Sequence, residues 1–261
     1  MTAPSGEQHE LAFEDQRATI VEVGGGLRTY VVGVREILYG YAEDEMCRSG
    51  RGQVLAPWPN RIEGGEYIFG NVDYQLGLTE PKAGNAIHGL VRWASWTMLE
   101  RDGARVVMGY LLHPQPGYPF TLRMTVEYAL GPKGLSVRTT AVNEGERACP
   151  FGVGHHPYIA APTGRVDDMT LDGEPVGNRE LDDPQRMDAP WRLRVDDVTV
   201  WADEKWKHVQ LFTGDPLPDV NRRALAVEPM TCPPNAFRTG EDLIRLEPGE
   251  RFTGTWGISV A

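Results

Sequence analysis

Two segments of the chain combine titratable side chains with residues that free or fix the backbone. The stretch GVGHHPY (152–158) places His155 and His156 between two glycines, which let the backbone approach a ligand closely, and a proline, which fixes the turn. Glu228 lies in AVEPMTCPPN (226–235), at the end of an apolar run and before a proline-rich loop. Burial there would raise the pKa of Glu228 toward neutrality, as a general base requires; a glutamate facing solvent is the alternative.

Two further segments present polar donors beside turn residues. In PWPNRIEGG (57–65), prolines and a glycine pair hold the backbone, and Asn60 and Arg61 present forked hydrogen-bond donors. In NAIHGL (85–90), His88 lies between apolar neighbours. These residues are suited to holding a polar small molecule, and an ordinary surface arginine and a hydrogen-bonded structural histidine are the alternatives.

The sequence gives little support to a metal or cofactor site. Adjacent residues of an extended chain point to opposite faces, so at most one of His155 and His156 is expected in a given site. Cys47, Cys149 and Cys232 are widely spaced and form no CxxC pair, which predicts buried thiols and neither disulfides nor a zinc cluster. P-loop, GxGxxG-helix and GxSxG motifs are absent from the sequence. We therefore expect no metal and no cofactor.

Charge and hydropathy exclude further classes of protein. The 26 Lys and Arg against 37 Asp and Glu give a net charge of −11, which disfavours nucleic-acid binding because phosphate contacts need clustered cations. The sequence has no run of about 18 apolar residues, and its start lacks the basic and apolar regions of a signal peptide. We expect a soluble, cytoplasmic protein without a membrane partner.

The elements that must position these residues are predicted to be β-strands. Apolar and polar residues alternate over 120–130 and again over 252–260, so each segment turns one face to a core. The 30 Gly and 20 Pro interrupt such runs, and no stretch free of them has the periodicity of a long helix. The pattern predicts an all-β fold, an antiparallel sandwich or barrel with few or no long helices.

The distribution of polar, acidic and turn residues predicts the organisation of the chain. We expect one continuous domain over 1–261, with residues 1–12 loose, residues 172–190 in a long acidic surface loop, and a hairpin turn at 24–26. Further strands are predicted at 18–23, 28–34, 37–41, 66–69, 73–77, 97–100, 105–112, 135–142, 166–171, 198–202, 207–212, 224–228 and 242–246. Most of the seven tryptophans are expected in the core, although one could stack on a sugar face.

Seven segments, taken in order, resemble the aldose 1-epimerase (mutarotase) family over nearly the whole chain. They are NRIEGGEYIFGNVDYQL (60–76), NAIHGLVRW (85–93), GYPFTLRMTVEYAL (117–130), GVGHHPYIA (152–160), VQLFTGD (209–215), AVEPMTCPPNAF (226–237) and LIRLEPGERF (243–252). The resemblance implies a galactose mutarotase-like antiparallel β-supersandwich, in agreement with the all-β pattern.

The resemblance also implies roles for individual residues. His156 would be the general acid and Glu228 the general base, and the substrate-binding set would be Asn60, Arg61, His88, Tyr158, Asp182 and Gln210. The region 160–200 is shorter than is usual in the family and matches its aspartate motif only in part, so Asp196 and Asp197 are rivals to Asp182. Ile159 stands where the family usually has phenylalanine.

The implied activity is the interconversion of the α and β anomers of an aldose by acid/base ring opening, with a small sugar as partner and a monomer or homodimer as the assembly. A non-catalytic carbohydrate-binding or regulatory module on the same fold is one alternative. A hexose-6-phosphate 1-epimerase is another, ranked lower because the sequence shows no second cluster of Arg or Lys beside the matched segments to clamp a phosphate.

Overall fold

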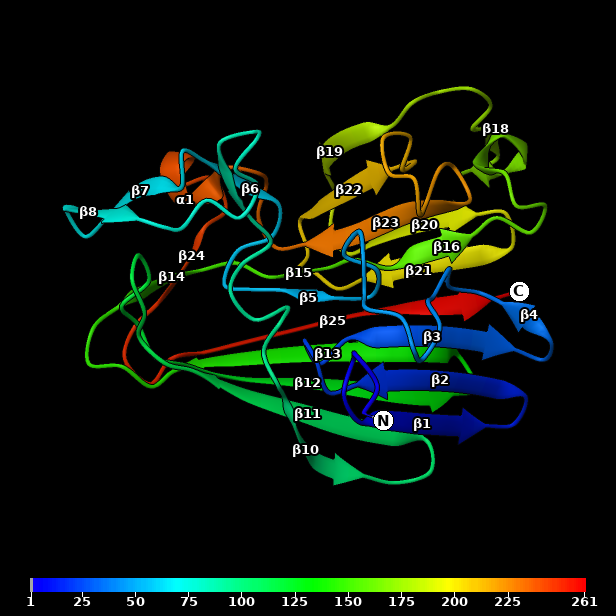
Figure 1. Ribbon diagram of the computed structural model, residues 1–261, viewed down its shortest axis with the longest axis horizontal. Helices are drawn as coiled ribbons and strands as arrows, with labels where there is room; N and C mark the ends of the chain where they lie inside the picture. The colour runs from blue at the N-terminus through cyan, green and yellow to red at the C-terminus, as the bar shows by residue number, and fades with distance from the viewer. Residues whose placement is uncertain (1) are drawn as a thin grey trace.

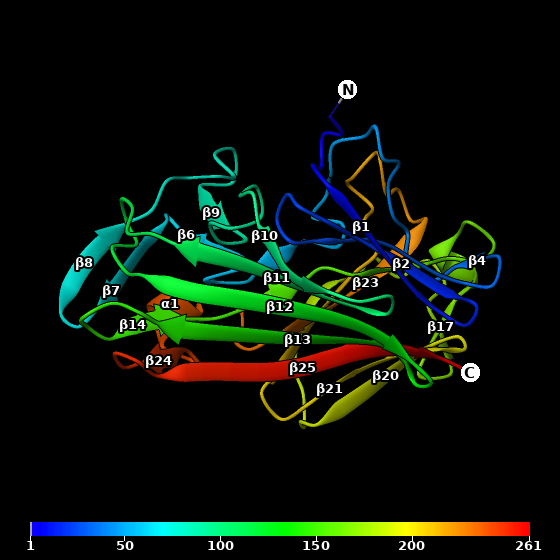
Figure 2. The ribbon, with the colours of Figure 1, turned by 90° about the horizontal axis from the view of Figure 1, so that it is seen from below.

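The alternating segments form the longest strands of the computed structural model, which describes residues 2–261. Within β12 (Leu122–Gly131) the apolar residues at even positions are buried and the residues between them are more exposed. The strand β12 pairs over its whole length with β13 (Gly134–Asn143), which in turn pairs with β25 (Arg251–Val260). The long strands β11, β12, β13 and β25 lie side by side in Figure 2.

These strands belong to a nine-stranded antiparallel sheet. Its remaining members, in spatial order, are β10 (Thr97–Arg101) and β11 (Arg105–Leu112) on one side of β12, and β21 (Val198–Ala202), β20 (Trp191–Val195), β17 (Thr170–Leu171) and β18 (Glu174–Pro175) beyond β25. The prediction of a strand over 166–171 was correct only for its end. Residues Val166–Asp168 form a 3-10 turn instead, because the backbone there bends to bond Arg222 O through Val166 N.

A four-stranded sheet packs against β11 and β12 and corrects the expectation for the N-terminus. Its strands are β1 (Gln8–Phe13), β2 (Gln16–Val21), β3 (Leu27–Val32) and β4 (Arg35–Glu36). Residues 8–12 are therefore ordered in a strand, because Leu11 is fully buried and its backbone pairs with β2. The glycines at 24–26 join β2 to β3, as predicted for a hairpin turn.

A six-stranded sheet carries Tyr158, Asp182, Gln210 and Glu228 of the predicted site, and several of its strands are labelled in Figure 1. In spatial order it contains β19 (Asp182–Arg186), β22 (His208–Phe212), β23 (Ala224–Met230), β15 (Gly154–His155) and β5 (Val54–Leu55), and β16 (Tyr158–Ala160) also pairs with β23. The surface loop expected over 172–190 is thus wrong in part. Its acidic, proline-containing sequence is compatible with β19 because β19 is an edge strand, where a proline need not donate to a neighbour.

Smaller pairs complete the fold. They are β6 (Arg61–Glu63) with β9 (Asn85–Ile87), β7 (Glu66–Phe69) with β8 (Val72–Gln75), and β14 (Cys149–Phe151) with β24 (Ile244–Leu246), together with the short helix α1 (Ala236–Thr239).

The strand predicted at 37–41 is wrong. Ile37 and Leu38 are buried, but the segment meets β16 through one isolated bridge at Leu38 rather than a ladder.

One continuous apolar core joins the three larger sheets, with members such as Ile20, Met124 and Val227. The nearly all-strand, antiparallel architecture confirms the all-β prediction. Over residues 2–261, none of the helices has the length and apolar character needed to cross a membrane.

Candidate active site

Glu228 lies in the middle of a strand that is buried on both faces. All seven residues of β23 are buried, and the Glu228 residue is 2% exposed. The antiparallel register of β22 and β23 places Gln210 directly opposite Glu228. The alternative of a glutamate facing solvent is therefore wrong, and Glu228 is a buried carboxyl group on a strand whose other residues are apolar.

His156 faces this carboxyl group from the neighbouring segment. Its Nε2 lies 3.3 Å from Oε1 of Glu228, and its ring stacks on Tyr158 with a centroid separation of 4.9 Å. The backbone of His156 is fixed by bonds to Gly52 and Gln53. Gly50, at a φ of 72°, provides the space that the His156 ring occupies, because a Cβ on residue 50 would lie 2.6 Å from Cδ2 of His156. The local backbone thus holds the imidazole against the carboxyl group.

Burial shifts the pKa values of His156 and Glu228 so that the neutral form of each group is favoured. Loss of hydration raises the pKa of Glu228 well above its ordinary value; the charge of Asp182 adds to the shift and that of Arg61 opposes it. Loss of hydration likewise lowers the pKa of His156 to about 3. A pair at this separation titrates as a unit, and the form carrying one shared proton offers one donor and one acceptor. Such a pair can give and take a proton in the same reaction.

Asn60, Arg61 and His88 reach the same place through the pairing of β6 with β9. Arg61 is paired with Ile87, and His88 N donates to Asn60 O at 2.8 Å. Asn60 and His88 both have left-handed backbones, with φ of 52° and 61°. The ring of His88 lies 5.4 Å from that of His156, centroid to centroid. Burial, with smaller effects from His156 and two arginines, lowers the pKa of His88 well below its ordinary value, so we assign it a neutral ring.

Arg61 is oriented by a carboxylate behind it. Its Nε and Nη2 donate to the two oxygens of Glu80 at 2.8 and 3.0 Å, and Asn85 Nδ2 donates to Glu80 at 2.9 Å. These bonds lower the pKa of Glu80 despite its partial burial. A bidentate pair of this kind fixes the plane of the guanidinium group.

A chain of amide and carboxylate groups runs along one wall of the site. Asn60 Nδ2 donates to Gln210 Oε1 at 3.2 Å, and Gln210 Nε2 donates to Asp182 Oδ1 at 2.8 Å. The two rivals of Asp182 lie elsewhere: Asp196 accepts from Thr170, and Asp197 forms an ion pair with Arg35. Of the three aspartates, the structure brings only Asp182 to this wall.

The eight predicted site residues all line one cavity of about 460 Å³. They are Asn60, Arg61, His88, His156, Tyr158, Asp182, Gln210 and Glu228. Cavities that enclose small ligands generally measure about 300–1,000 Å³. Within residues 2–261, Glu228 Oε2 and Nδ1 of both His88 and His156 are buried without a hydrogen-bond partner. Buried polar atoms of this kind are costly to leave unpaired, so the cavity is suited to a polar ligand.

Comparison with known proteins identifies the family of the chain. The family model described as aldose 1-epimerase matches residues 7–175. The chain belongs to the aldose 1-epimerase family. The chain is 34% identical to YihR of Escherichia coli K12, described as an uncharacterized protein, over 94% of this chain and 91% of YihR. The predicted family is thereby confirmed. It is a family of isomerase-type enzymes.

Solved structures show the fold of the family. A GalM/aldose epimerase homologue from C. elegans superimposes with a TM-score of 0.84 at 15% identity, covering 98% of this chain and 99% of that one. A galactose mutarotase-like protein from Clostridium acetobutylicum superimposes with a TM-score of 0.83 at 16% identity, covering 98% of each chain. A galactose 1-epimerase from Lactobacillus acidophilus superimposes with a TM-score of 0.81 at 18% identity, covering 97% of this chain and 94% of that one. The galactose mutarotase-like fold is thus confirmed.

His155 is not among the residues that line this cavity. Its Nε2 is hydrogen-bonded to Thr139 Oγ1 at 2.8 Å, and its ring packs against Trp206 and Trp256 at centroid distances of 5.6 and 5.2 Å. Adjacent residues of the extended segment do point to opposite faces, as expected. His155 is therefore a core residue and His156 a cavity residue.

Two cavity residues that were not predicted follow His88 in the matched segment NAIHGLVRW. Arg92 and Trp93 both line the cavity, and the Arg92 guanidinium lies 5.5 Å from the centre of the Trp93 ring. Trp93 is 49% exposed, whereas Trp58, Trp96 and Trp256 belong to the core as expected. The lack of an alternating pattern around Trp93 was a usable signal that this tryptophan lies outside a buried strand.

One cluster outside the cavity has the residue types of a metal site. Ligand atoms of His208, Glu241 and Asp242 lie within 4.8 Å of one another. The Asp242 carboxylate, however, already binds Lys207 Nζ at 2.7 Å, His208 Nε2 at 2.9 Å and the Arg186 guanidinium. Three donors on one carboxylate, two of them permanent cations, oppose a divalent ion there. We assign the cluster to ion pairing.

Proposed function

We propose that the protein is an aldose 1-epimerase that interconverts the α and β anomers of a sugar. The observation that carries the proposal is the contact of His156 with Glu228, 3.3 Å apart and buried at a cavity of about 460 Å³. An acid and a base of this kind can act at the two oxygens bonded to an anomeric carbon. The family membership supports the same reaction class.

In the proposed reaction, Glu228 removes the proton from the anomeric hydroxyl while protonated His156 gives a proton to the ring oxygen. The bond between C1 and O5 breaks, its electron pair stays on O5, and C1 becomes an aldehyde carbon. Rotation about the C1–C2 bond presents the other face of the aldehyde, and the two proton transfers then run in reverse. No proton is gained or lost over the cycle.

The electrostatics of the site fit both halves of this cycle. Burial favours the neutral pair, so ring opening moves the protons in the direction that burial favours. Arg61 favours the carboxylate form of Glu228, which is needed to start the reaction. Neutral His88 can donate an N–H to a sugar oxygen, and Asn60, Asp182 and Gln210 offer bonds to sugar hydroxyls. The exposed face of Trp93 can pack against the C–H groups of the sugar ring.

A polarimetric mutarotation screen tests the proposal. Galactose, glucose, xylose, arabinose and fucose are offered to the wild type, to Glu228→Gln and to Glu36→Gln, whose carboxylate is exposed on β4. We expect acceleration of at least one sugar, a loss of about 10²–10⁴-fold in Glu228→Gln, and wild-type rates in Glu36→Gln. An unchanged rate in Glu228→Gln would refute the assigned role.

A non-catalytic sugar-binding module is the rival from another class. Binding of a sugar, seen by calorimetry, without acceleration of its mutarotation would establish that rival. The close approach of His156 to Glu228 counts against it, because a binding module has no need for a buried acid and base in contact.

A hexose-6-phosphate 1-epimerase becomes a stronger second candidate in the structure than in the sequence. Arg92 lines the cavity, and over residues 2–261 it takes part in no ion pair. It is therefore a cation available to an anionic substituent. Adding glucose 6-phosphate and galactose 6-phosphate to the screen, with Arg92→Met, separates the two reactions. A preference for the phosphates that Arg92→Met abolishes would favour this second candidate.

A further inference from the structure

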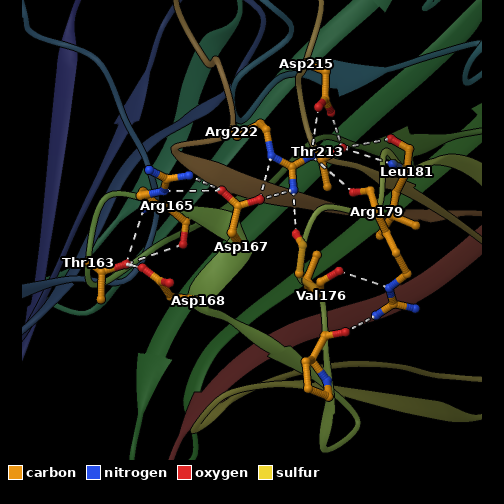
Figure 3. Close-up of polar contacts among 12 residues, drawn as sticks. Thr163, Arg165, Asp167, Asp168, Val176, Arg179, Leu181, Thr213, Asp215 and Arg222 are labelled. Atoms are coloured by element: carbon orange, nitrogen blue, oxygen red, sulfur yellow. Dashed lines mark hydrogen bonds and ion pairs between the residues drawn. The ribbon is translucent and has the colours of Figure 1, made fainter.

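Arg222 lies at the centre of a polar network that joins two distant parts of the chain (Figure 3). It belongs to the connection between β22 and β23, where its backbone has a left-handed φ of 59°. Around it runs the segment 163–181, which leads from β16 through β17 and β18 to β19. The network therefore lies just before Asp182, the first residue of β19.

The guanidinium group of Arg222 uses all five of its N–H donors. Nε and Nη2 donate to Asp167 Oδ1 at 3.0 and 2.6 Å, and Nη1 donates to Asp215 Oδ1 at 2.7 Å. Nη2 also donates to Gly177 O at 2.7 Å, and Nη1 to Arg179 O at 3.1 Å. One side chain thus ties two carboxylates and two backbone carbonyls together. The segment 167–179 is fixed to the β22–β23 connection at three points.

From this network a short path leads to the cavity. Asp215 accepts a hydrogen bond from the hydroxyl group of fully buried Thr213. Thr213 in turn holds Leu181 on both sides: Leu181 N donates to Thr213 Oγ1 and Thr213 N donates to Leu181 O, each at 3.0 Å. The next residue is Asp182, whose Oδ1 accepts the bond from Gln210 in the cavity wall.

The edge position of β19 explains why such a fixing point is needed. Asp182 is exposed, and β19 pairs with β22 on one side only. The sequence around it is acidic and contains Pro184, which by itself is typical of a loop. An exposed edge strand with this composition has little intrinsic order. Pairing with β22 orders one side of β19, and the bonds that start at Arg222 fix the segment that leads into Asp182.

We propose that Arg222 is a positioning residue that holds Asp182 against Gln210 and thereby sets the affinity of the cavity for sugar hydroxyls. The inference rests on the proposed epimerase function for its kinetic consequence. Arg222 does not line the cavity and touches no reacting atom. Its removal therefore acts on substrate binding and leaves the contact of His156 with Glu228 in place.

A matched control comes from the same network. Arg165 also binds Asp167, at 3.0 Å through Nη2, but its side chain is 72% exposed. Its side-chain donors bind Asp167 alone within residues 2–261, and they reach neither Asp215 nor the carbonyls of Gly177 and Arg179. Arg165→Met thus removes an ion pair to Asp167 without cutting the path to Asp182.

The test compares Arg222→Met, Arg222→Lys and Arg165→Met with the wild type by steady-state kinetics on the preferred sugar. We expect KM to rise by about tenfold in Arg222→Met, the effect of one misplaced charged hydrogen bond, with kcat within about threefold of the wild type. Arg222→Lys, which keeps one of the carboxylate contacts, should recover part of the loss, and Arg165→Met should match the wild type. An unchanged KM in Arg222→Met, or a fall in kcat alone, overturns the proposal.

A second readout does not depend on activity. The side-chain amide resonances of Gln210 in a ¹⁵N–¹H spectrum, assigned by their loss in Gln210→Ala, report the bond to Asp182. We expect them to move in Arg222→Met as they do in Asp182→Ala, and to stay in place in Arg165→Met. If the wild type accelerates no sugar, the proposed function fails while this spectrum still decides the inference: unmoved resonances overturn it. Should Arg222→Met not fold, Asp215→Asn cuts the same path and takes its place.

Discussion

Replacing Glu228 by glutamine is expected to stabilise the folded protein while it slows the reaction. The folded protein buries Glu228 almost completely, and this burial raises its pKa well above the ordinary value of 4.5. A group whose folded pKa is raised gives stability that is fully present below the unfolded pKa and is lost as the pH rises through the folded pKa. The wild type therefore loses stability above pH 4.5 through this group, and the glutamine variant does not.

The size of the effect follows from the strength of the shift. Each unit of difference between the folded and unfolded pKa is worth about 1.4 kcal/mol, and the charge of Arg61 offsets part of the shift that burial produces. We expect the free energy of unfolding of Glu228→Gln to equal that of the wild type near pH 4.5 and to exceed it by about 1–2 kcal/mol at pH 8.

Urea unfolding at 25 °C, followed by tryptophan fluorescence at several pH values between 4.5 and 8, measures this difference. Asp242→Asn is a control of opposite sign: burial would raise the pKa of Asp242, but hydrogen bonds from Lys207 and His208 hold it at about 2. That variant should be less stable than the wild type at neutral pH. A difference for Glu228→Gln that is flat with pH, or a less stable variant at pH 8, would refute the reasoning.

Three further outcomes are expected. His156→Gln should lower kcat by about 10²–10⁴-fold, as the loss of an acid or base group does, and polarimetry checks it; a fall in KM alone would contradict the assigned role. Gly50→Ala should lower both stability, by about 1–3 kcal/mol, and kcat, because its Cβ would lie 2.6 Å from the His156 ring on a left-handed backbone; wild-type thermal unfolding would count against this close packing. Trp93→Ala should raise KM severalfold with little change in urea stability, since the side chain is half exposed at the cavity; an unchanged KM would exclude a stacking role.

Much of the fold could be predicted because its signal is local. The alternation over 120–130 predicts a strand with one buried face. The strand β12 forms there and buries the predicted apolar face. The three glycines at 24–26 specify a tight connection wherever the neighbouring strands lie. The errors fall where a strand depends on its neighbours. The strand β1 was missed because a histidine, His9, is one of its two buried residues, and β19 was missed because its sequence resembles a loop.

At the site, residue types alone show which side chains could do acid/base chemistry. Residue types beside turn residues singled out Asn60, Arg61, His88, Glu228 and the pair of His155 and His156. The family resemblance chose His156 from that pair and added Tyr158, Asp182 and Gln210. The folded structure was needed to show that Glu228 faces His156 and that Asp182, rather than Asp196 or Asp197, is hydrogen-bonded to Gln210.

The physical reason is that these facts depend on contacts between residues far apart in the chain. The burial that shifts the pKa of Glu228 comes from pairing β23 with β22 and β16, and no local pattern encodes that register. The place of Asp182 depends on Arg222, 40 residues later in the sequence, through Thr213 and Leu181. The sequence names the groups that can react, and the long-range packing sets their protonation and their partners.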